Sequence, residues 1–340
     1  MSDPLFVAVD GGGSKTDLVL ARASGQVLSV ARGPRSSPQL IGLDGSLEVL
    51  DALLAEASGP VHLNFRDGSV AELAQLLVAG VDFPSEENEF REAVERRGWA
   101  RRTLVGNDTF AVLRAGTERG WGIAVVCGAG INCVGVAPDG RHARFPALGA
   151  ITGDWGGGYD LGIAAVSAAA RSEDGRGPRT ALEQAVPAHF GLSTPQELAE
   201  AFHRGGIPLQ RADELPKVVF AAAATDEVAA GIVDRLALEV VALARVALRR
   251  LELEGQPVEI LLGGGLLQAR DGRLTRAIED GLDEVDPQAV VRIATSPPIV
   301  GAALLALDEL GAPAEAQERL RRELGEEVDR LDGERSAAGG

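Results

Sequence analysis

The stretch LFVAVDGGGSKTDLVL, residues 5–20, decides the fold. An apolar segment ends at Asp10, and three glycines, Ser14, Lys15 and Thr16 precede a second apolar segment. Because glycines carry no Cβ, an anion can approach this backbone closely, and successive N–H groups in such a turn form a concave site for phosphate. An acid such as Asp10 beside a phosphate site indicates that Mg²⁺ lies between them.

A Walker-type loop is the usual alternative for a glycine-rich turn, but it does not fit here. That motif requires Gly directly before Lys and a helix afterwards. In this sequence Ser14 precedes Lys15, and the apolar residues that follow run to a tight-turn sequence at 23–26. The stretch therefore predicts strand, loop and strand. An ordinary hairpin without a ligand is the simpler alternative and stays open.

Composition limits the compartment and the partners. The 340 residues suggest two domains, and 45% of them are hydrophobic, enough for sizeable cores. A formal charge of −17 predicts that the protein binds neither nucleic acid nor anionic membrane. Two cysteines make no disulfide framework, and no basic segment followed by an apolar run opens the sequence, so a cytoplasmic protein is expected.

The opening pattern occurs a second time. Residues 123–127 predict a strand, the turn Gly128-Ala129-Gly130 follows, and residues 133–140 predict a returning strand and a hairpin turn. Two such bends facing each other would hold the two ends of a polyphosphate. An internal duplication of this kind is a stronger signal than either bend alone.

The remaining segments predict further strands and helices. Strands are expected at residues 27–31, 103–105 and 258–262, and helices at residues 85–98, 109–115, 159–171, 231–251 and 299–310. Residues 70–81 predict a short helix leading into a strand, and residues 61–69 stay unassigned. The tail from residue 313 predicts a solvated helix with a disordered end.

Five motifs, DGGGSKT, GND, GAGINC, GDWGGGYDLG and LGGGLL, follow one another in this order. Together they resemble the N-acetylglucosamine kinase family, which shares its ATPase core with activators of acyl-CoA dehydratases and reductases. The resemblance spans about residues 5–310. It implies an α/β protein with the two-lobed, actin-like ATPase (ribonuclease H-like) fold and a cleft between the lobes.

The resemblance also implies the domain organisation and the activity. The N-terminal lobe would comprise residues 1–115 plus about 299–312, the C-terminal lobe residues 116–298, and the solvated, partly disordered tail residues 313–340. The implied reaction is phosphorylation of the 6-hydroxyl of N-acetylglucosamine, with glucose as a further option. ATP and Mg²⁺ would be the cofactors, a small-molecule sugar the partner, and a homodimer one option for the assembly.

The resemblance assigns roles to individual residues. The implied nucleotide-binding positions are Gly11, Gly12, Gly13, Ser14, Lys15, Thr16, Gly128, Ala129, Gly130, Gly263, Gly264 and Gly265. The implied sugar-binding positions are Ser37, Asn107, Asp108, Asn132, Ala147, Leu148, Gly149 and Asp154. Two positions depart from the family pattern: the family usually has Thr or Ser in place of Ala129, and an asparagine often touches the sugar in place of Ser37. The second departure leaves the exact sugar open.

Asp108 matches the catalytic acid of the family. It would accept the proton of a sugar hydroxyl as that hydroxyl attacks the γ-phosphorus. From its position alone, Asp108 could equally cap the helix that follows. Alternatives also stay open for Asp10 and Asp154, which could be turn residues, and for Lys15, which could be solvent-exposed.

Cys127 and Cys133 suggest a rival function. An activator ATPase of the same superfamily would use thiolates to hold an iron–sulfur cluster, shared between two subunits because one chain supplies too few ligands. Buried or pocket-lining thiols are the simpler expectation. The four histidines show no metal-ligand spacing with the cysteines, so Asp10 is the one metal ligand predicted.

Overall fold

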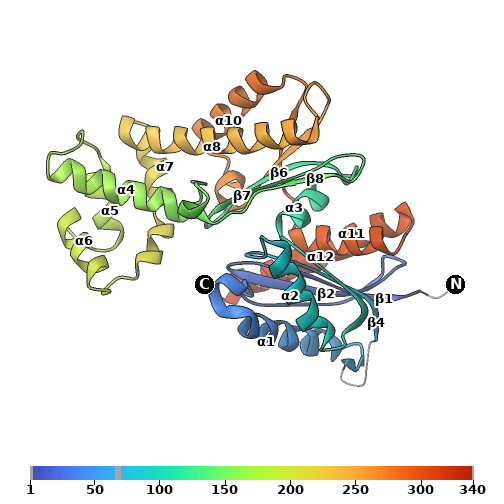
Figure 1. Ribbon diagram of the computed structural model, residues 1–340. Coiled ribbons are helices and arrows are strands. Elements are labelled where there is room, and N and C mark those ends of the chain that lie inside the picture. Colours follow the sequence, from blue (N-terminus) through green and yellow to red (C-terminus); the bar gives the residue numbers. More distant parts are fainter. Residues whose placement is uncertain (1–2, 66–69, 339–340) are drawn as a thin grey trace. The chain divides into compact units, whose positions relative to one another are not determined.

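The computed structural model describes residues 3–65 and 70–338 and divides into two compact units, which Figure 1 shows in ribbon form. Unit 1 comprises Met1–Gly122 and Ala294–Gly340, and unit 2 comprises Ile123–Ile293. Each unit contains one five-stranded sheet and several helices. The α/β class expected from the sequence is therefore confirmed. The predicted lobe limits, after residue 115 and before residue 299, lie near these divisions.

The sheet of unit 1 has the strand order β3-β2-β1-β4-β5. Its strands are β1 (Leu5–Gly11), β2 (Lys15–Arg22), β3 (Val27–Pro34), β4 (Ala71–Val78) and β5 (Ala100–Gly106). The first three form an antiparallel meander, and β4 and β5 extend the sheet in parallel from β1. This arrangement places the β1–β2 bend and the carboxyl ends of β4 and β5 at the same edge of the sheet.

Helices cover both faces of this sheet. Side chains alternate across β1, so Val7 and Val9 face one helical layer while Phe6 and Ala8 face the other. The first layer contains α1 (Pro38–Ser58) and α2 (Pro84–Glu95). The second contains α3 (Thr109–Gly116), α11 (Pro298–Glu309) and α12 (Ala314–Ala338).

The structure corrects two predictions for unit 1. Residues 70–81 contain no initial helix, because β4 begins at Ala71 and runs as a strand to Val78. A central parallel strand is apolar on both faces, and such a run resembles a short buried helix in sequence. The tail is not simply solvated, because α12 buries Leu320, Leu324 and Val328 in the core of unit 1. Residues 66–69 and 339–340, which belong to two earlier predictions, lie outside the described residues.

Polar contacts also anchor α12 to unit 1. Arg321 donates hydrogen bonds to the carbonyl oxygens of Ala115 (2.8 Å) and Thr117 (3.1 Å), where α3 ends. Asp332 pairs with Arg32, which also binds Asp17 on β2. The helix is therefore tied both to the end of α3 and to the neighbourhood of the β1–β2 hairpin.

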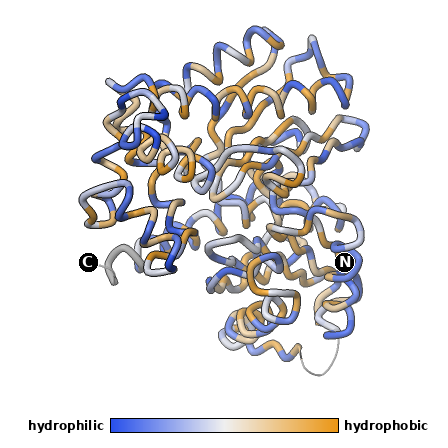
Figure 2. Tube along the Cα trace, turned by 60° about the vertical axis from the view of Figure 1, so that its left-hand side comes forward, coloured by the Kyte–Doolittle hydropathy of each residue, from blue (hydrophilic) through white to orange (hydrophobic). Residues whose placement is uncertain are grey.

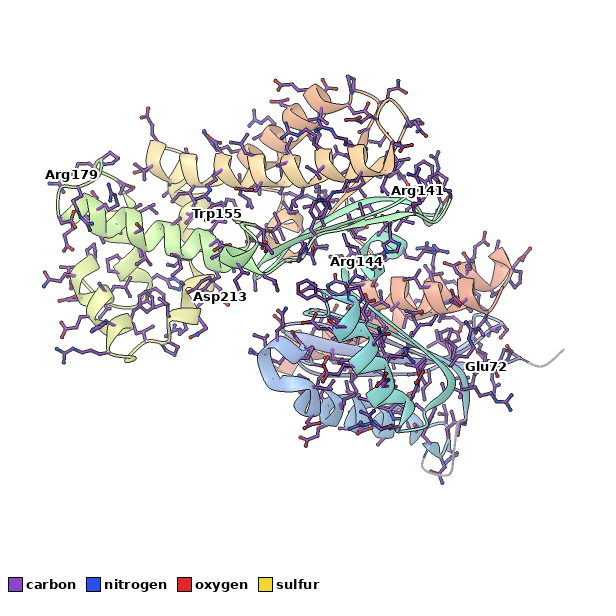
Figure 3. The ribbon with its side chains drawn as sticks, in the orientation of Figure 1. Glu72, Arg141, Arg144, Trp155, Arg179 and Asp213 are labelled. Atoms are coloured by element: carbon purple, nitrogen blue, oxygen red, sulfur yellow. The ribbon has the colours of Figure 1, made fainter. Side chains whose placement is uncertain are left out.

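The sheet of unit 2 repeats the topology of unit 1. Its order is β10-β9-β6-β7-β8, which in reverse is the same meander followed by two parallel strands. The strands are β6 (Gly122–Cys127), β7 (Ile131–Val136), β8 (His142–Arg144), β9 (Glu259–Gly263) and β10 (Val290–Ile293). Figure 3 labels Arg141 and Arg144 at the two ends of β8. The duplication seen in the two glycine bends thus extends to the whole sheet.

Most helices of unit 2 lie between β8 and β9 in the sequence. They are α4 (Gly158–Glu173), α5 (Leu182–His189), α6 (Pro195–His203), α7 (Pro216–Ala223) and α8 (Glu227–Leu251), and α9 (Gly265–Gln268) and α10 (Gly272–Val285) follow β9. Hydrophobic and hydrophilic residues alternate in bands along these helices in Figure 2, and α8 buries Val233, Leu236 and Val240 on one side. No helix in the described ranges is long and apolar enough to cross a bilayer.

Candidate active site

The β1–β2 bend is a tight, backbone-closed hairpin. The Gly12 N–H donates to the Lys15 carbonyl oxygen at 2.9 Å, and a Cβ on Gly12 would lie 2.8 Å from that oxygen, so only glycine fits. Thr16 is fully buried and donates its hydroxyl to Ser36 Oγ at 2.8 Å. Ser14 is exposed and the Lys15 side chain is 41% exposed. Thr16 thus supports the bend from behind, while Ser14 and Lys15 lie at its surface.

Carboxylates gather behind this bend. Asp17 is buried and accepts hydrogen bonds from Nε and Nη2 of Arg32, and Lys15 Nζ lies 3.4 Å from Asp17 Oδ2. Asp10, at the end of β1, is half-buried. Burial raises the pKa of Asp10 well above its ordinary value, and the negative charges of Asp108 and Asp17 raise it further. Asp10 and Asp108, both predicted site residues, therefore belong to one group of electrostatically interacting acids.

This group of acids suits a cation. Like charges in a poorly solvated place disfavour ionisation, and a divalent cation would relieve that penalty. Among the described residues, no group of three or more His, Cys, Asp or Glu side chains is arranged to hold a metal ion. A single carboxylate fits Mg²⁺ nonetheless, because Mg²⁺ keeps several waters and usually shares its remaining positions between substrate phosphates and one or two carboxylates.

Asp108 lies between β5 and α3, as the sequence predicts. It occupies the N-cap position of α3, yet its side chain makes no capping hydrogen bond. Asn107 takes that role instead: its Oδ1 accepts from the Thr109 N–H (3.0 Å) and from Thr109 Oγ1 (2.6 Å). The capping hydrogen bond of α3 is therefore made by Asn107, while the Asp108 carboxylate lies near the Thr109 N–H without making that bond.

The pKa of Asp108 is raised to about 7. Burial is the main cause, the charge of Asp82 is the second, and the N–H groups of Thr109 and of Asp108 itself oppose the shift. A carboxylate of this pKa is a much stronger base than an ordinary aspartate. At neutral pH about half of it is ionised and able to accept a proton, which suits general-base chemistry.

Asp82 is a residue of this site that was not predicted from the sequence. Asp82 Oδ1 accepts a hydrogen bond from Asn107 Nδ2 at 2.8 Å, and its Oδ2 accepts one from Gln39 Nε2 at 3.0 Å. A signal was present, because Asp82 follows the carboxyl end of β4, the parallel neighbour of β5. Ligand-binding residues collect at that end of the strands in open α/β sheets.

Ser37, a predicted sugar contact, is buried at the start of α1 and makes no capping hydrogen bond. A Cβ on Gly80 would lie 2.8 Å from Ser37 Oγ, so the turn after β4 packs directly against this hydroxyl. The structure thus places Ser37 beside the turn that carries Asp82, in the same unit as Asp108.

The second glycine bend, between β6 and β7, is held by backbone contacts with α4. The Gly128 N–H donates to the Gly130 carbonyl at 2.9 Å, and Ala129 and Gly130 are exposed. The carbonyls of Gly128 and Ala129 accept hydrogen bonds from the N–H groups of Gly158 and Tyr159, at 2.8 Å and 3.2 Å. The first turn of α4 therefore packs directly on this bend.

Gly157 makes this contact with α4 possible. Its φ is +89°, and a Cβ there would lie 2.5 Å from the Ala129 carbonyl oxygen. Gly157 belongs to the motif GDWGGGYDLG, but no role was predicted for it from the sequence. The run Gly156-Gly157-Gly158 was the signal that the backbone approaches another segment closely.

The third glycine run meets the same bend. β9 ends at Gly263 and α9 starts at Gly265, as expected for a strand that meets a helix. A Cβ on Gly264, whose φ is +83°, would lie 2.4 Å from the Cys127 carbonyl oxygen. Within unit 2, the predicted nucleotide-binding glycines 263–265 thus lie in direct contact with the strand that leads into the second glycine bend.

The predicted sugar positions of unit 2 form a loop closed by its own hydrogen bonds. Asp154 Oδ2 accepts from the Gly149 N–H at 2.8 Å, and Asp154 Oδ1 accepts from Thr152 Oγ1. Ala147 and Leu148, both half-buried, lead into this loop. Asn132 Oδ1 accepts from the Cys133 N–H at 2.7 Å. These contacts match the turn-forming alternative for Asp154, and its contact with sugar stays a prediction.

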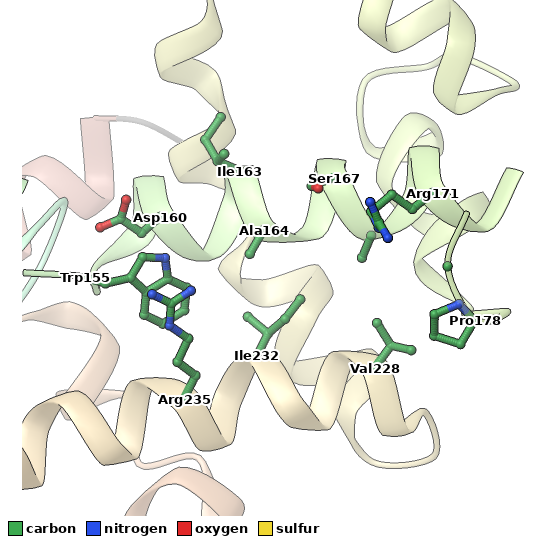
Figure 4. A pocket seen from close by; sticks show the side chains of 12 residues that line it. Trp155, Asp160, Ile163, Ala164, Ser167, Arg171, Pro178, Val228, Ile232 and Arg235 are labelled. Carbon is green, nitrogen blue, oxygen red and sulfur yellow. The ribbon is translucent and has the colours of Figure 1, made fainter. Parts of the chain in front are cut away.

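A cavity of about 450 Å³ lies between α4 and α8, beside this loop. Figure 4 shows Trp155 at one end of it, with the Arg235 guanidinium stacked on the indole ring at 4.0 Å from the ring centre. Ile163, Ser167 and Ile232 line the remainder. Trp155 therefore packs against Arg235 of α8 in the lining of this cavity.

The two cysteines are buried. Burial raises the pKa of Cys127 to about 12, and it raises the pKa of Cys133 as well. Thiols that stay protonated and inaccessible are poor ligands for a cluster shared with a second subunit. The structure thus gives no support to the rival function as an activator ATPase.

Comparison with known proteins agrees with these features. The model of the BadF/BadG/BcrA/BcrD ATPase family matches residues 7–306. The N-acetylmuramic acid/N-acetylglucosamine kinase of Clostridium acetobutylicum is 29% identical over 263 residues, which cover 77% of this chain and 85% of that protein. The N-acetyl-D-glucosamine kinase of Dictyostelium discoideum is 26% identical over 317 residues, covering 91% and 99%.

A solved structure also matches. It is described as a candidate N-acetylglucosamine kinase from Chromobacterium violaceum, with a TM-score of 0.71 and 25% identity, and the match covers 90% of this chain and 99% of that one. Together these matches confirm the resemblance that the five motifs suggest.

Proposed function

Because the chain belongs to the BadF/BadG/BcrA/BcrD ATPase family, we propose that it is an ATP-dependent sugar kinase that phosphorylates the 6-hydroxyl of N-acetylglucosamine. Two relatives and one solved structure that resemble it over most of its length carry N-acetylglucosamine kinase in their names. One observation in the site supports this proposal above the others. Asp108 is a half-buried carboxylate with a pKa of about 7 that is not used to cap α3.

Asp108 acts as the general base in this proposal. Its carboxylate accepts the proton of the sugar 6-hydroxyl while the hydroxyl oxygen forms a bond to the γ-phosphorus, and the bond from that phosphorus to the bridging oxygen of ADP breaks. The products are the sugar phosphate and ADP. Positioned proton acceptors of this kind typically contribute about 10²–10⁴-fold to the rate.

The glycine bends bind phosphate in this proposal. The first bend offers the ammonium group of Lys15 and backbone N–H groups other than that of Gly12, which is bonded to the Lys15 carbonyl. The second offers backbone N–H groups other than that of Gly128, which is bonded to the Gly130 carbonyl. Asp10 is the residue that would hold Mg²⁺, which when bound neutralises phosphate charge. Gly263, Gly264 and Gly265 would receive the adenosine.

The sugar contacts are assigned more narrowly than the sequence suggested. Asn132, Gly149 and Asp154 remain sugar-binding positions of the proposal, with Ala147 and Leu148 beside them and Ser37 in unit 1. Asn107 changes role, because its amide is bonded to Thr109 and Asp82. N-acetylmuramic acid joins glucose as a second candidate substrate, because one relative is named for it.

A coupled assay of ADP release over a panel of sugars tests the proposal. The panel contains N-acetylglucosamine, N-acetylmuramic acid and glucose, and mass spectrometry with phosphorus-coupled NMR identifies the product and the phosphorylated position. We expect N-acetylglucosamine 6-phosphate to form in step with ADP. ADP release that no sugar accelerates would refute the kinase assignment, and phosphate on another hydroxyl would refute the 6-position.

A further inference from the structure

Three polar side chains of unit 1 form a hydrogen-bonded chain that ends beside Asp108. Gln39, near the start of α1, and Asn107, at the end of β5, each donate to one oxygen of Asp82, at 3.0 Å and 2.8 Å. Asn107 Oδ1 then accepts from the N–H and the hydroxyl of Thr109. The side-chain NH₂ of Asn107 must donate to Asp82 and its side-chain oxygen must accept from Thr109. These two residues therefore fix the orientation of the Asn107 amide.

The backbone that carries Asp82 is also held in place. Glu86 Oε2, in the first turn of α2, accepts from the N–H groups of Asp82 (2.8 Å) and Phe83 (3.0 Å). Gly80, with φ at +78°, lets the turn approach α1 so closely that a Cβ would lie 2.7 Å from Gln39 Cγ. Asp82 is therefore fixed by contacts from α1, from α2 and from Asn107.

This chain determines which side chain caps α3. Aspartate is a favoured N-cap residue, and Asp108 occupies the N-cap position. Asn107 Oδ1 is the side-chain oxygen bonded to the Thr109 N–H, and the Asp108 carboxylate lies near the same N–H without making the capping hydrogen bond. A carboxylate that capped the helix would turn toward the helix N-terminus and would become a weaker base, because hydrogen bonds to the charged form stabilise it.

We propose that Asp82 is a positioning residue for phosphoryl transfer, which acts through Asn107 to occupy the Thr109 N–H and so keeps the Asp108 carboxylate from capping α3 and available to the substrate hydroxyl. The kinetic part of this inference rests on the proposed kinase function. The structural part, the orientation of Asp108, does not.

Kinetics of three variants test the proposal. Asp82→Ala removes the anchor of Asn107, and we expect kcat to fall about 10–100-fold, part of the full contribution of a general base, with KM for ATP changed less than about twofold. Asp82→Asn keeps a carbonyl oxygen that can accept from Asn107. Its new NH₂ group can donate to the Gln39 side-chain oxygen once the Gln39 amide has flipped. This variant should therefore retain kcat within about threefold on the high-pH plateau. Asp44→Ala, an exposed aspartate of α1, is the matched control and should behave as wild type.

Several outcomes would overturn the positioning role. They are a wild-type kcat in Asp82→Ala, a loss confined to KM for ATP, or an Asp82→Asn variant as impaired as Asp82→Ala. If Asp82→Ala fails to fold, as judged by thermal unfolding, Gln39→Ala is the second variant. It removes the exposed hydrogen bond from Gln39 to Asp82 and leaves the Asp82–Asn107 bond in place. That variant should lower kcat several-fold, and an unchanged kcat would contradict the proposal.

A crystal structure of Asp82→Ala tests orientation without any substrate. We expect the Asn107 amide to turn away from Thr109 and the Asp108 carboxylate to accept the full hydrogen bond from the Thr109 N–H in its place. A structure in which Asn107 still accepts that bond would refute the inference. This measurement separates the two proposals. A wild-type protein that phosphorylates no sugar, together with a displaced Asp108 in the variant, would refute the kinase function and leave the positioning of Asp108 intact.

Discussion

The two glycine hairpins have the same strand topology but different chemistry. Asp10 precedes the first glycine run, whereas Cys127, a neutral thiol with a pKa of about 12, precedes the second. The first hairpin is supported by polar side chains, namely the buried Thr16 bonded to Ser36 and Asp17 bonded to Arg32. The second is supported by backbone, through Gly157 and Gly264.

This difference indicates a division of labour between duplicated units. The first hairpin and its neighbours concentrate acids, which suit cation binding and proton transfer. The second presents uncharged backbone, and the carbonyl oxygens of its bend are hydrogen-bonded to the first turn of α4. Substitutions that change charge in unit 1 should therefore mainly lower kcat. Substitutions that change the backbone shape in unit 2 should mainly lower stability and weaken nucleotide binding.

The largest effect is expected for Asp108→Asn. The amide cannot accept the hydroxyl proton, so kcat should fall about 10²–10⁴-fold, while ATP binding measured by calorimetry should stay near wild type. Near-normal turnover would show that Asp108 is not the general base. It would also contradict the assignment of proton transfer to unit 1.

Gly157→Ala tests the backbone support of the second hairpin. The new Cβ would lie 2.5 Å from the Ala129 carbonyl oxygen at a φ of +89°, so we expect about 2–5 kcal/mol of destabilisation in denaturant unfolding, together with weaker ATP binding. Gly175→Ala is the matched control, because its φ is +80° but no atom lies within 4 Å of the new Cβ. Equal losses in both variants would show that φ strain, and not contact with the second hairpin, is responsible.

The pH dependence sharpens the electrostatic side of the comparison. Because burial and Asp82 raise the pKa of Asp108 to about 7, kcat should fall about tenfold per pH unit below that value. Asp82→Asn should shift the midpoint to lower pH, because the charge of Asp82 is the second cause of the raised pKa after burial. A midpoint that stays at pH 7 in that variant would contradict the assigned cause.

The raised pKa of Asp108 also makes the stability of the protein depend on pH. The pKa of Asp108 is higher in the folded state than its ordinary value of 3.8, so its contribution to stability is complete below about pH 4 and is lost as the pH rises to about 7. Asp108→Asn should remove that part of the pH dependence of unfolding. An unchanged dependence in the variant would mean that other groups cause it.

The smallest effect is expected for Ala129→Ser. Ala129 is exposed in the second bend, where the family usually has a hydroxyl, so serine would add one hydrogen bond to phosphate. One such bond contributes about 0.5–1.5 kcal/mol, which predicts a fall in KM for ATP of about two- to tenfold with kcat unchanged. A higher KM would show that this bend does not face phosphate.

Local patterns in the sequence were enough to predict the hairpins and the place of Asp108, because each depends on residues adjacent in the chain. Asp82 and Gly157 could not be assigned in this way. Their contacts, to Asn107 and to Ala129, join segments that are distant in sequence. The start of β4 was misjudged because a short apolar run fits a buried strand and a buried helix equally well.

The helix α12 lies beyond the residues that match the family, yet unit 1 is incomplete without it. Leu320, Leu324 and Val328 complete its hydrophobic core, and Arg321 holds the end of α3. A protein truncated after residue 306, where the family match ends, would expose the apolar surface that α12 covers. Such a protein should aggregate on expression. Expression work on this protein should therefore keep residues 313–338.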